Sequence, residues 1–471
     1  MHAFLLHPLM LLTCHRRRLR PPPPPVNKRH QPPLATVVQA TTMLGSLHHH
    51  HHSSSSDDTD NTNNDTKNGS GFLAAASAPP PSARDLVLAC ADLLQRGDLP
   101  AARRAAGVLL SAASPRADAS DRLAYHFARA LALRADAAAG NLLVPSSSAS
   151  AAAAARPPPS GAYLAFNQIA PFLRFAHLTA NQAILDAVDG ARRVHILDLD
   201  AAHGVQWPPL LQAIAERAAA SPGVPPPEVR ITGAGADRDT LLRTGSRLRA
   251  FARSIHLPFR FTPLLLSSSS AGAPAAATAS SAAAGTTSQL ELHSDETLAV
   301  NCVMFLHKLG GQEEVSAFLK WVKAMSPAVV TVAEREPAGG GGNGGGYDDD
   351  LHRRAAVAME HYAAVFEALE ATAPPGSRER MAVEQEVLGR EIEAALAPGA
   401  GGRWWSGLER WGAAARAAGF AARPLSAFAV SQARLLLRLH YPSEGYLVQE
   451  ARGACFLGWQ TRPLLSVSAW Q

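Results

Sequence analysis

The clearest group of residues that could perform chemistry follows a short apolar run, from Asp198 through Asp200 and His203 to Gly204. The group lies where a first strand would meet a first helix, and in doubly wound folds this crevice binds nucleotides or cofactors. A cofactor-binding loop here also needs glycines, because the backbone must come close to the ligand. Only Gly204 is present, so the sequence disfavours catalysis with S-adenosylmethionine. In the alternative interpretation, Asp198 and Asp200 accept hydrogen bonds from turn amides or cap the next helix.

Other single residues give weaker signals. His195 lies inside the apolar run, where a buried, hydrogen-bonded imidazole is the favoured interpretation. Gly233 and Gly235 resemble half of a dinucleotide-binding fingerprint, but a tight turn accounts for them equally well. No catalytic triad order, P-loop, HExxH or kinase motif occurs. Four cysteines lie far apart without metal-ligand spacing: Cys14, Cys90, Cys302 and Cys455. The sequence therefore predicts no catalytic residue, no cofactor and no metal site.

A helix expected over 239–256 carries an apolar stripe and many arginines. These are Arg238, Arg243, Arg247, Arg249 and Arg253. An arginine-rich helix face is a candidate for contact with DNA phosphates. A solvated or ion-paired face is the alternative, because charge runs are common on helices. The sequence leaves both interpretations open.

Alternating strands and helices must position these residues. Apolar runs predict strands at 194–199, 228–233, 257–266, 297–304 and 328–333, followed by an antiparallel hairpin from 445–450 and 454–460. Helical patterns predict helices at 207–220, 239–256, 313–325, 348–371, 379–397, 404–418 and 427–440. This order predicts an α/β fold with a mostly parallel sheet, in the layout of a methyltransferase-type Rossmann core.

The chain before this core divides into two parts. Residues 1–83 are rich in Pro, His, Ser and Asn and are predicted to be disordered, with 1–42 expected to be an upstream extension. Order is expected from Ser82, which has capping-box spacing to Asp85. A mainly helical cap is predicted over 84–187, and the core over 188–471.

Composition limits the classes of partner. The net charge of +5 comes from 44 Lys and Arg against 39 Asp and Glu, but residues 1–42 alone carry +6, which leaves −1 on residues 43–471. The basic charge is thus no argument for a nucleic-acid-binding domain. No apolar run reaches the length of a membrane span, so no membrane partner is expected. Scattered cysteines fit a reducing compartment.

Several motifs resemble those of the plant GRAS family, in the family's order. The VHIID motif corresponds to Val194, His195, Ile196, Leu197 and Asp198. Leucine-rich regions flank it at about 84–134 and 239–266. A PFYRE-like region corresponds to Pro327, Tyr362, Phe366, Arg390 and Glu391, and the SAW motif to Ser468, Ala469 and Trp470. Segments such as "LHSDETLAVNCVMFLHKLGG" resemble the Lateral suppressor/Monoculm branch, in particular its grass members.

The resemblance implies a nuclear transcriptional regulator that promotes axillary meristem formation, and hence branching or tillering. It implies a helical cap on a Rossmann-like core without enzyme activity. Expected partners are other transcription factors or GRAS proteins, including homo- or heterodimers, with DNA as a further candidate. Trp470 is expected to pack structurally. The alternative is a small-molecule methyltransferase, or a ligand sensor, that uses the crevice after the first strand.

Overall fold

The computed structural model describes residues 81–140, 160–201, 203–220, 223–266, 290–309, 311–337, 350–397 and 407–471. The predicted disorder of residues 1–83 falls almost entirely outside these ranges. Within them, the expected capping box at Ser82 is present. Ser82 Oγ accepts a hydrogen bond from the Asp85 amide at 3.2 Å, and the Ser82 amide donates to the Asp85 carboxylate at 2.9 Å. This reciprocal pair caps the first helix.

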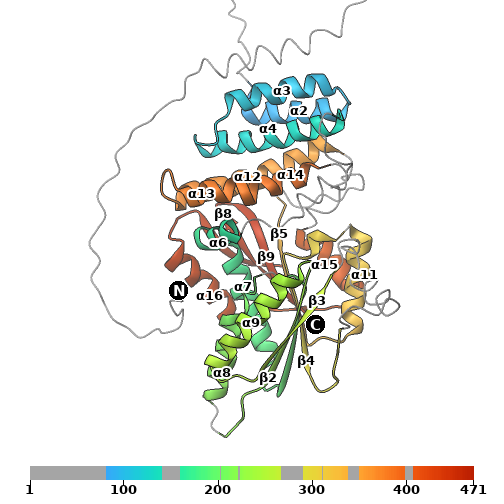
Figure 1. The fold of residues 1–471 in the computed structure, drawn as a ribbon, viewed down its shortest axis with the longest axis vertical. Helices are drawn as coiled ribbons and strands as arrows, with labels where there is room; N and C mark the ends of the chain where they lie inside the picture. The colour runs from blue at the N-terminus through green and yellow to red at the C-terminus, as the bar shows by residue number, and fades with distance from the viewer. Residues whose placement is uncertain are drawn as a thin grey trace, which may run out of the picture.

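A mixed sheet forms the centre of the described part of the chain (Figure 1). Its strands are β1 (Arg193–Asp198), β2 (Glu228–Gly235), β3 (Phe259–Leu265), β4 (Thr297–Val303), β5 (Val329–Arg335), β6 (Ala422–Arg423), β7 (Tyr446–Ala451), β8 (Ala454–Trp459) and β9 (Arg462–Trp470). The strand order is β3-β2-β1-β4-β5-β9-β8-β7, and β6 pairs with β9. Strands β1 to β5 are parallel to one another. The predicted Rossmann-like α/β core is confirmed.

The end of the sheet differs from the prediction in one respect. The expected antiparallel hairpin is present as β7 and β8, but it does not join the parallel strands directly. Strand β9 lies between them and pairs antiparallel with both β5 and β8. The last residues of the chain, which the sequence reading left without a strand, therefore form a central strand that links the two parts of the sheet.

Further helices lie around the sheet. They are α6 (Ser160–Ile169), α7 (Phe172–Ala187), α8 (Trp207–Ala219), α9 (Arg238–Ser254), α11 (Gln312–Ala324), α15 (Gly407–Ala417) and α16 (Ala427–His440). Helix α7 packs on β4, β5 and β9, while α16 packs on α7 and β7. Helix α9 packs on β2 and β3, α11 packs with α15, and α6 packs mainly on α13 (Arg378–Val383). The crossover helices α8, α9 and α11 help to bury the apolar strands of the parallel sheet.

A separate helical layer lies at one end of the molecule, beyond the carboxyl ends of the parallel strands (Figure 1). It consists of α2 (Ala83–Gln95), α3 (Leu99–Ala112), α4 (Ala119–Ala138), α12 (Leu351–Thr372), α13 (Arg378–Val383) and α14 (Gly389–Leu396). Helices α12 and α14 pack against α2 and α4, and α12 also contacts β8 and β9. The helical cap expected from 84–187 thus also includes a segment from the second half of the chain.

A buried ion pair joins the two halves of this layer. Arg122 on α4 is fully buried, and its Nε donates to both carboxylate oxygens of Glu384 at 3.2 and 3.0 Å. Glu384 begins a π-helical turn, Glu384–Leu388, between α13 and α14. Arg380, also buried, lies 3.7 Å from the same carboxylate. Burial outweighs the two arginines and raises the pKa of Glu384.

Candidate functional site

The VHIID motif occupies β1 at the centre of the parallel strands, and Asp198 stands at its carboxyl end. Ligands of doubly wound folds bind at this edge. Asp198 is only 4% exposed, and both of its carboxylate oxygens are used inside the protein. Oδ2 accepts from Trp207 Nε1 at 2.8 Å, and Oδ1 accepts from Asn301 Nδ2 at 3.1 Å. The carboxylate therefore fastens α8 and β4 to β1.

An amide network continues from Asp198 into the core. The side-chain amide Nε2 of Gln206 donates to Asn301 Oδ1 at 3.0 Å and to Asn181 Oδ1 at 3.1 Å. Thr331 Oγ1 donates to the same Asn301 oxygen at 2.9 Å. The network joins β1, β4, β5, α7 and the start of α8 through side chains that are nearly all buried. Such a connected set of satisfied polar groups fixes one arrangement of these elements.

Burial gives Asp198 a pH-dependent effect on stability. Because burial raises the pKa of Asp198 to about 6, the folded protein keeps this proton up to that pH. The unfolded chain releases it near its ordinary pKa of 3.8. The contribution to stability is thus complete below about pH 4 and falls by about 3 kcal/mol as the pH rises to 6.

We expect Asp198→Asn to abolish this part of the pH dependence. Urea unfolding of the native chain and of the variant, at several values between about pH 4 and pH 7, measures it. Asp189→Asn, at a side chain that is 77% exposed, is the matched control. If native and Asp198→Asn proteins show the same slope across this range, the assignment is wrong.

The loop after β1 packs on protein rather than forming an open cradle. Gly204 has a φ of +65°, and a Cβ there would lie 2.6 Å from Thr244 Cγ2 on α9. Asp200 pairs with Lys308, which follows β4, at 2.6 Å. The ring of Tyr163 contacts that of His203 in a tilted arrangement, with centroids 5.4 Å apart. The single glycine of the loop is needed because α9 comes so close.

His195 belongs to a buried polar cluster. It is 1% exposed; Arg230 Nη2 lies 3.1 Å from its Nδ1, and Thr232 Oγ1 lies 2.9 Å from its Nε2. Arg230 also pairs with Glu296. Burial and the Arg230 charge lower the pKa of His195 to about 4, so the imidazole is neutral near pH 7. Because the guanidinium can only donate, Nδ1 accepts and Nε2 carries the proton.

The structure brings together only part of the PFYRE-like set. Tyr362 Oη donates to Glu391 Oε2 at 3.2 Å. Burial of the phenol raises the pKa of Tyr362. Phe366 is buried against the ring of His126. Pro327 is buried just before β5, and Arg390 forms a pair with Glu386 at 2.8 Å on the helix surface. The five residues do not form one site.

Three charged residues at the end of β5 were missed as a cluster by sequence reasoning. Glu334 Oε2 lies within hydrogen-bond distance of His307 Nδ1, at 2.9 Å. Arg335 forms an ion pair with Glu391. Glu336 is 5% exposed and accepts from the Leu408 amide at 3.0 Å and from Ser466 Oγ. The signal was alternating charge directly after an apolar strand. These contacts connect β5 to α14, to the start of α15 and to β9.

The SAW motif lies at the end of β9. Ser468 and Ala469 are buried, and Ser468 Oγ accepts from Trp470 Nε1 at 2.9 Å. Trp470 is 2% exposed and meets Trp411 of α15 edge to face, with ring centroids 5.6 Å apart. The motif thus joins the sheet to α15 by packing.

The arginines of α9 lie on two sides of the helix. With 3.6 residues per turn, Arg238, Arg249 and Arg253 flank one side of the apolar stripe, and Arg243 and Arg247 flank the other. All five arginines nevertheless lie outside the buried stripe, and their contact with DNA stays a prediction. Two of the five arginines donate hydrogen bonds to backbone carbonyls. Arg247 donates to the His203 carbonyl at 3.0 Å, and Arg249 donates to the Phe261 carbonyl at 2.9 Å.

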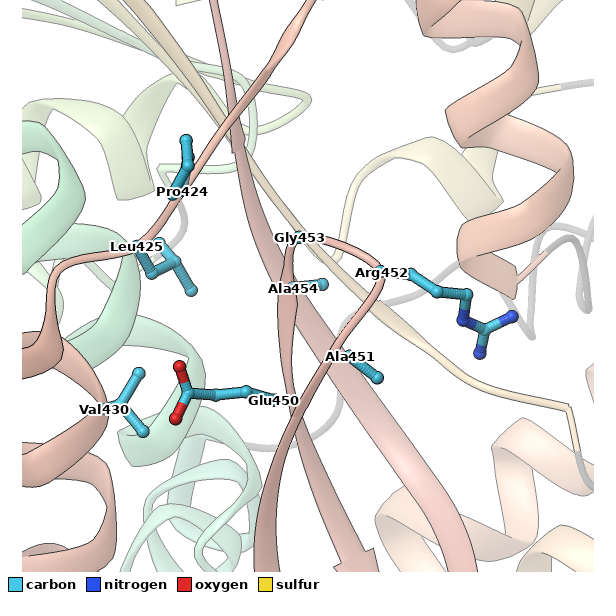
Figure 2. Close-up of a pocket in the computed structure, with 8 residues that line it drawn as sticks. All are labelled: Pro424, Leu425, Val430, Glu450, Ala451, Arg452, Gly453 and Ala454. Atoms are coloured by element: carbon cyan, nitrogen blue, oxygen red, sulfur yellow. The ribbon is translucent and has the colours of Figure 1, made fainter.

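A recess of about 270 Å³ lies between the start of α16 and the β7–β8 turn (Figure 2). It is lined by Pro424, Leu425, Val430, Glu450, Ala451, Arg452, Gly453 and Ala454. The Glu450 carboxylate points toward Val430, while the Arg452 side chain points away (Figure 2). Glu450 is already paired with Arg434 at 3.1 Å. The lining is polar and apolar in about equal parts, and its carboxylate already has a partner, so the recess suits contact with a side chain better than catalysis.

The described ranges hold no group of three His, Cys, Asp or Glu side chains placed to bind a metal ion. No helix in them is both long enough and apolar enough to cross a membrane.

Comparison with known proteins explains the motif order. The GRAS domain family matches residues 83–471. The chain belongs to the GRAS family. Its GRAS domain accordingly comprises both the helical layer and the Rossmann-like core described above. The chain is 76% identical to Protein MONOCULM 1 of rice over 397 residues. The aligned residues cover 83% of this chain and 88% of that protein.

More distant GRAS relatives agree. Scarecrow-like protein 18 of Arabidopsis thaliana is 39% identical over 426 residues, 82% of this chain and 91% of that protein. Among solved structures, SCL7 of Oryza sativa matches with a TM-score of 0.63 and 32% identity, over 84% of this chain and 100% of that one. The GRAS fold with its Rossmann-like core is therefore common to this chain and SCL7.

Proposed function

We propose that this GRAS protein is a nuclear transcriptional regulator that promotes axillary meristem initiation, and hence shoot branching or tillering. The observation that carries the proposal is the 76% identity to Protein MONOCULM 1 over most of both chains. The motif segments that resemble the Lateral suppressor/Monoculm branch support the same assignment.

We further propose that the protein acts through protein partners rather than by catalysis. The polar groups at the carboxyl edge of the sheet support this proposal, since Asp198 and Asn301 bond to each other and to neighbouring side chains. The loop beside them packs on α9 through Gly204. A methyltransferase would need these groups to face a ligand.

Complementation tests the biological role. A rice line that lacks MONOCULM 1 receives this coding sequence, and we expect more tillers per plant than in the empty-vector line. A fluorescent fusion in the same plants is expected to accumulate in nuclei. Unchanged tiller number with normal protein levels would contradict the proposal.

Calorimetry with S-adenosylmethionine tests the enzyme alternative: micromolar binding that Asp198→Asn abolishes would favour a methyltransferase.

Direct contact with DNA is a separate expectation for α9. We expect Arg243→Glu with Arg247→Glu to weaken DNA binding and to flatten its salt dependence, because phosphate contacts release counterions. Fluorescence anisotropy with a random DNA pool at two salt concentrations measures both effects. Arg238→Glu with Arg253→Glu is the matched pair on the other side of the helix. No change in affinity or salt slope for either pair would remove α9 from the DNA-binding surface.

A further inference from the structure

Helix α16 lies at one side of the molecule (Figure 1). Several of its apolar side chains form a ridge that is exposed to solvent. Phe428 and Leu439 are 58% and 60% exposed, and they are two of the three most exposed large apolar side chains among the described residues. Leu435 lies between them and is half-buried. The spacing of seven and four residues places all three on one line along the helix. Ser431 and Gln432 occupy the turn between Phe428 and Leu435, so the ridge is apolar at both ends and polar between them. Single exposed apolar residues are ordinary, but their alignment on one helix face indicates a contact surface.

Basic side chains flank this ridge on one side. Arg434 and Arg438 stand four residues apart and are exposed, and α16 contains no Asp or Glu. Arg434 pairs with Glu450 of β7 at 3.1 Å, in a pair that is 51% and 53% exposed. No ion pair of Arg438 is found within the described residues. The face is therefore apolar and basic.

The opposite side of α16 is fixed to the protein. Its buried residues are Ala429, Val430, Ala433, Leu436 and Leu437, and they pack on α7 and β7. Ser426 Oγ accepts from the Ala429 amide at 3.3 Å and caps the helix. The ridge is consequently presented by a rigid helix, and a partner that binds it need not order it first.

We propose that α16 is a docking surface for an amphipathic helix of a protein partner, with acidic residues along one side of its apolar face. The partner's apolar side chains would cover Phe428, Leu435 and Leu439, as in helix-in-groove recognition. Its carboxylates would meet Arg438 and compete with Glu450 for Arg434. A second copy of this chain is a poorer occupant, because a two-fold contact through α16 would set arginines against arginines.

Peptide binding to the full-length chain tests the surface. Two labelled helical peptides of about 18 residues share one apolar face and differ only in flanking Glu or Lys. By fluorescence anisotropy we expect the Glu peptide to bind at least about tenfold more tightly than the Lys peptide. The inference rests on the proposed action through protein partners. The two tests are independent, because loss of peptide binding would contradict the α16 surface, whereas an unchanged tiller number would contradict the proposed function.

Variants distinguish the contacts. Arg438→Glu and Leu439→Ser are each expected to weaken binding of the Glu peptide by about tenfold. Glu450→Gln is expected to strengthen it severalfold, because it frees Arg434. Arg104→Glu on α3 makes the same charge change at another exposed arginine and should have no effect. Equal binding of both peptides, or native affinity in Arg438→Glu, would overturn the proposal, as would a dimer in sedimentation that Leu439→Ser dissociates.

Discussion

Glu384→Ala is expected to lower the free energy of unfolding by about 3–5 kcal/mol. The fully buried Arg122 would lose both hydrogen bonds to this carboxylate, and the buried Arg380 would lose its nearest anion. Arg122 would retain its bond to the Ala117 carbonyl at 2.6 Å and a 3.6 Å ion pair with the half-exposed Glu370. An incompletely compensated charge in the interior is costly because its desolvation is not repaid.

Urea unfolding measures this loss directly. Glu386→Ala is the control, since this neighbouring carboxylate lies at the surface and pairs with Arg390; we expect a change of no more than about 1 kcal/mol. Replacing both partners, as Arg122→Met with Glu384→Leu, should cost less than Glu384→Ala alone, because no charge is left buried. A single variant as stable as the native protein would show that water reaches the arginine.

The second large effect is expected for Trp470→Ala, at about 3–5 kcal/mol. Trp470 is 2% exposed, pairs with Val330 of β5 and Ala422 of β6, and packs edge to face on Trp411. Its removal leaves a cavity at the junction of the sheet and α15. Loss of apolar contacts and of the aromatic pair both contribute.

Thermal and urea unfolding of three variants separate packing from other roles. Trp470→Phe keeps much of the ring contact and should lie between Trp470→Ala and the native protein. Phe428→Ala removes an aromatic side chain that is 58% exposed and should change stability by about 0.5 kcal/mol or less. If Trp470→Ala unfolds like the native chain yet fails to complement, the tryptophan contacts a partner instead.

The parallel strands were predictable because each is a compact apolar run between helical patterns. Strand β9 was not, because Pro463 and two serines are unfavourable in a strand interior. The structure accommodates Pro463 opposite Gly458, at a register shift in the β8–β9 ladder. The extra residue at this shift is Leu464 of β9 itself, and a bulge of this kind is not visible in the local sequence pattern.

The site shows the same division. Asp198 could be placed at the end of a strand from its own neighbours, but Asn301 and Gln206 reach it only because the crossovers bring β1 and β4 side by side. The low glycine content of the loop disfavours a cofactor cradle, and this stays a prediction. The contact between Arg122 and Glu384 spans 262 positions, and neither residue's local sequence indicates the other.

The position of β9 also has a consequence for how the protein is made. Its nine residues are translated after the other strands of the sheet, yet they fill the gap between β5 and β8. While the ribosome holds this segment, the nascent chain presents two unpaired strand edges, which are sites of aggregation. We therefore expect premature stop codons ahead of β9 to yield chains that are cleared by proteolysis, whatever the residues of β9 contact in the mature protein.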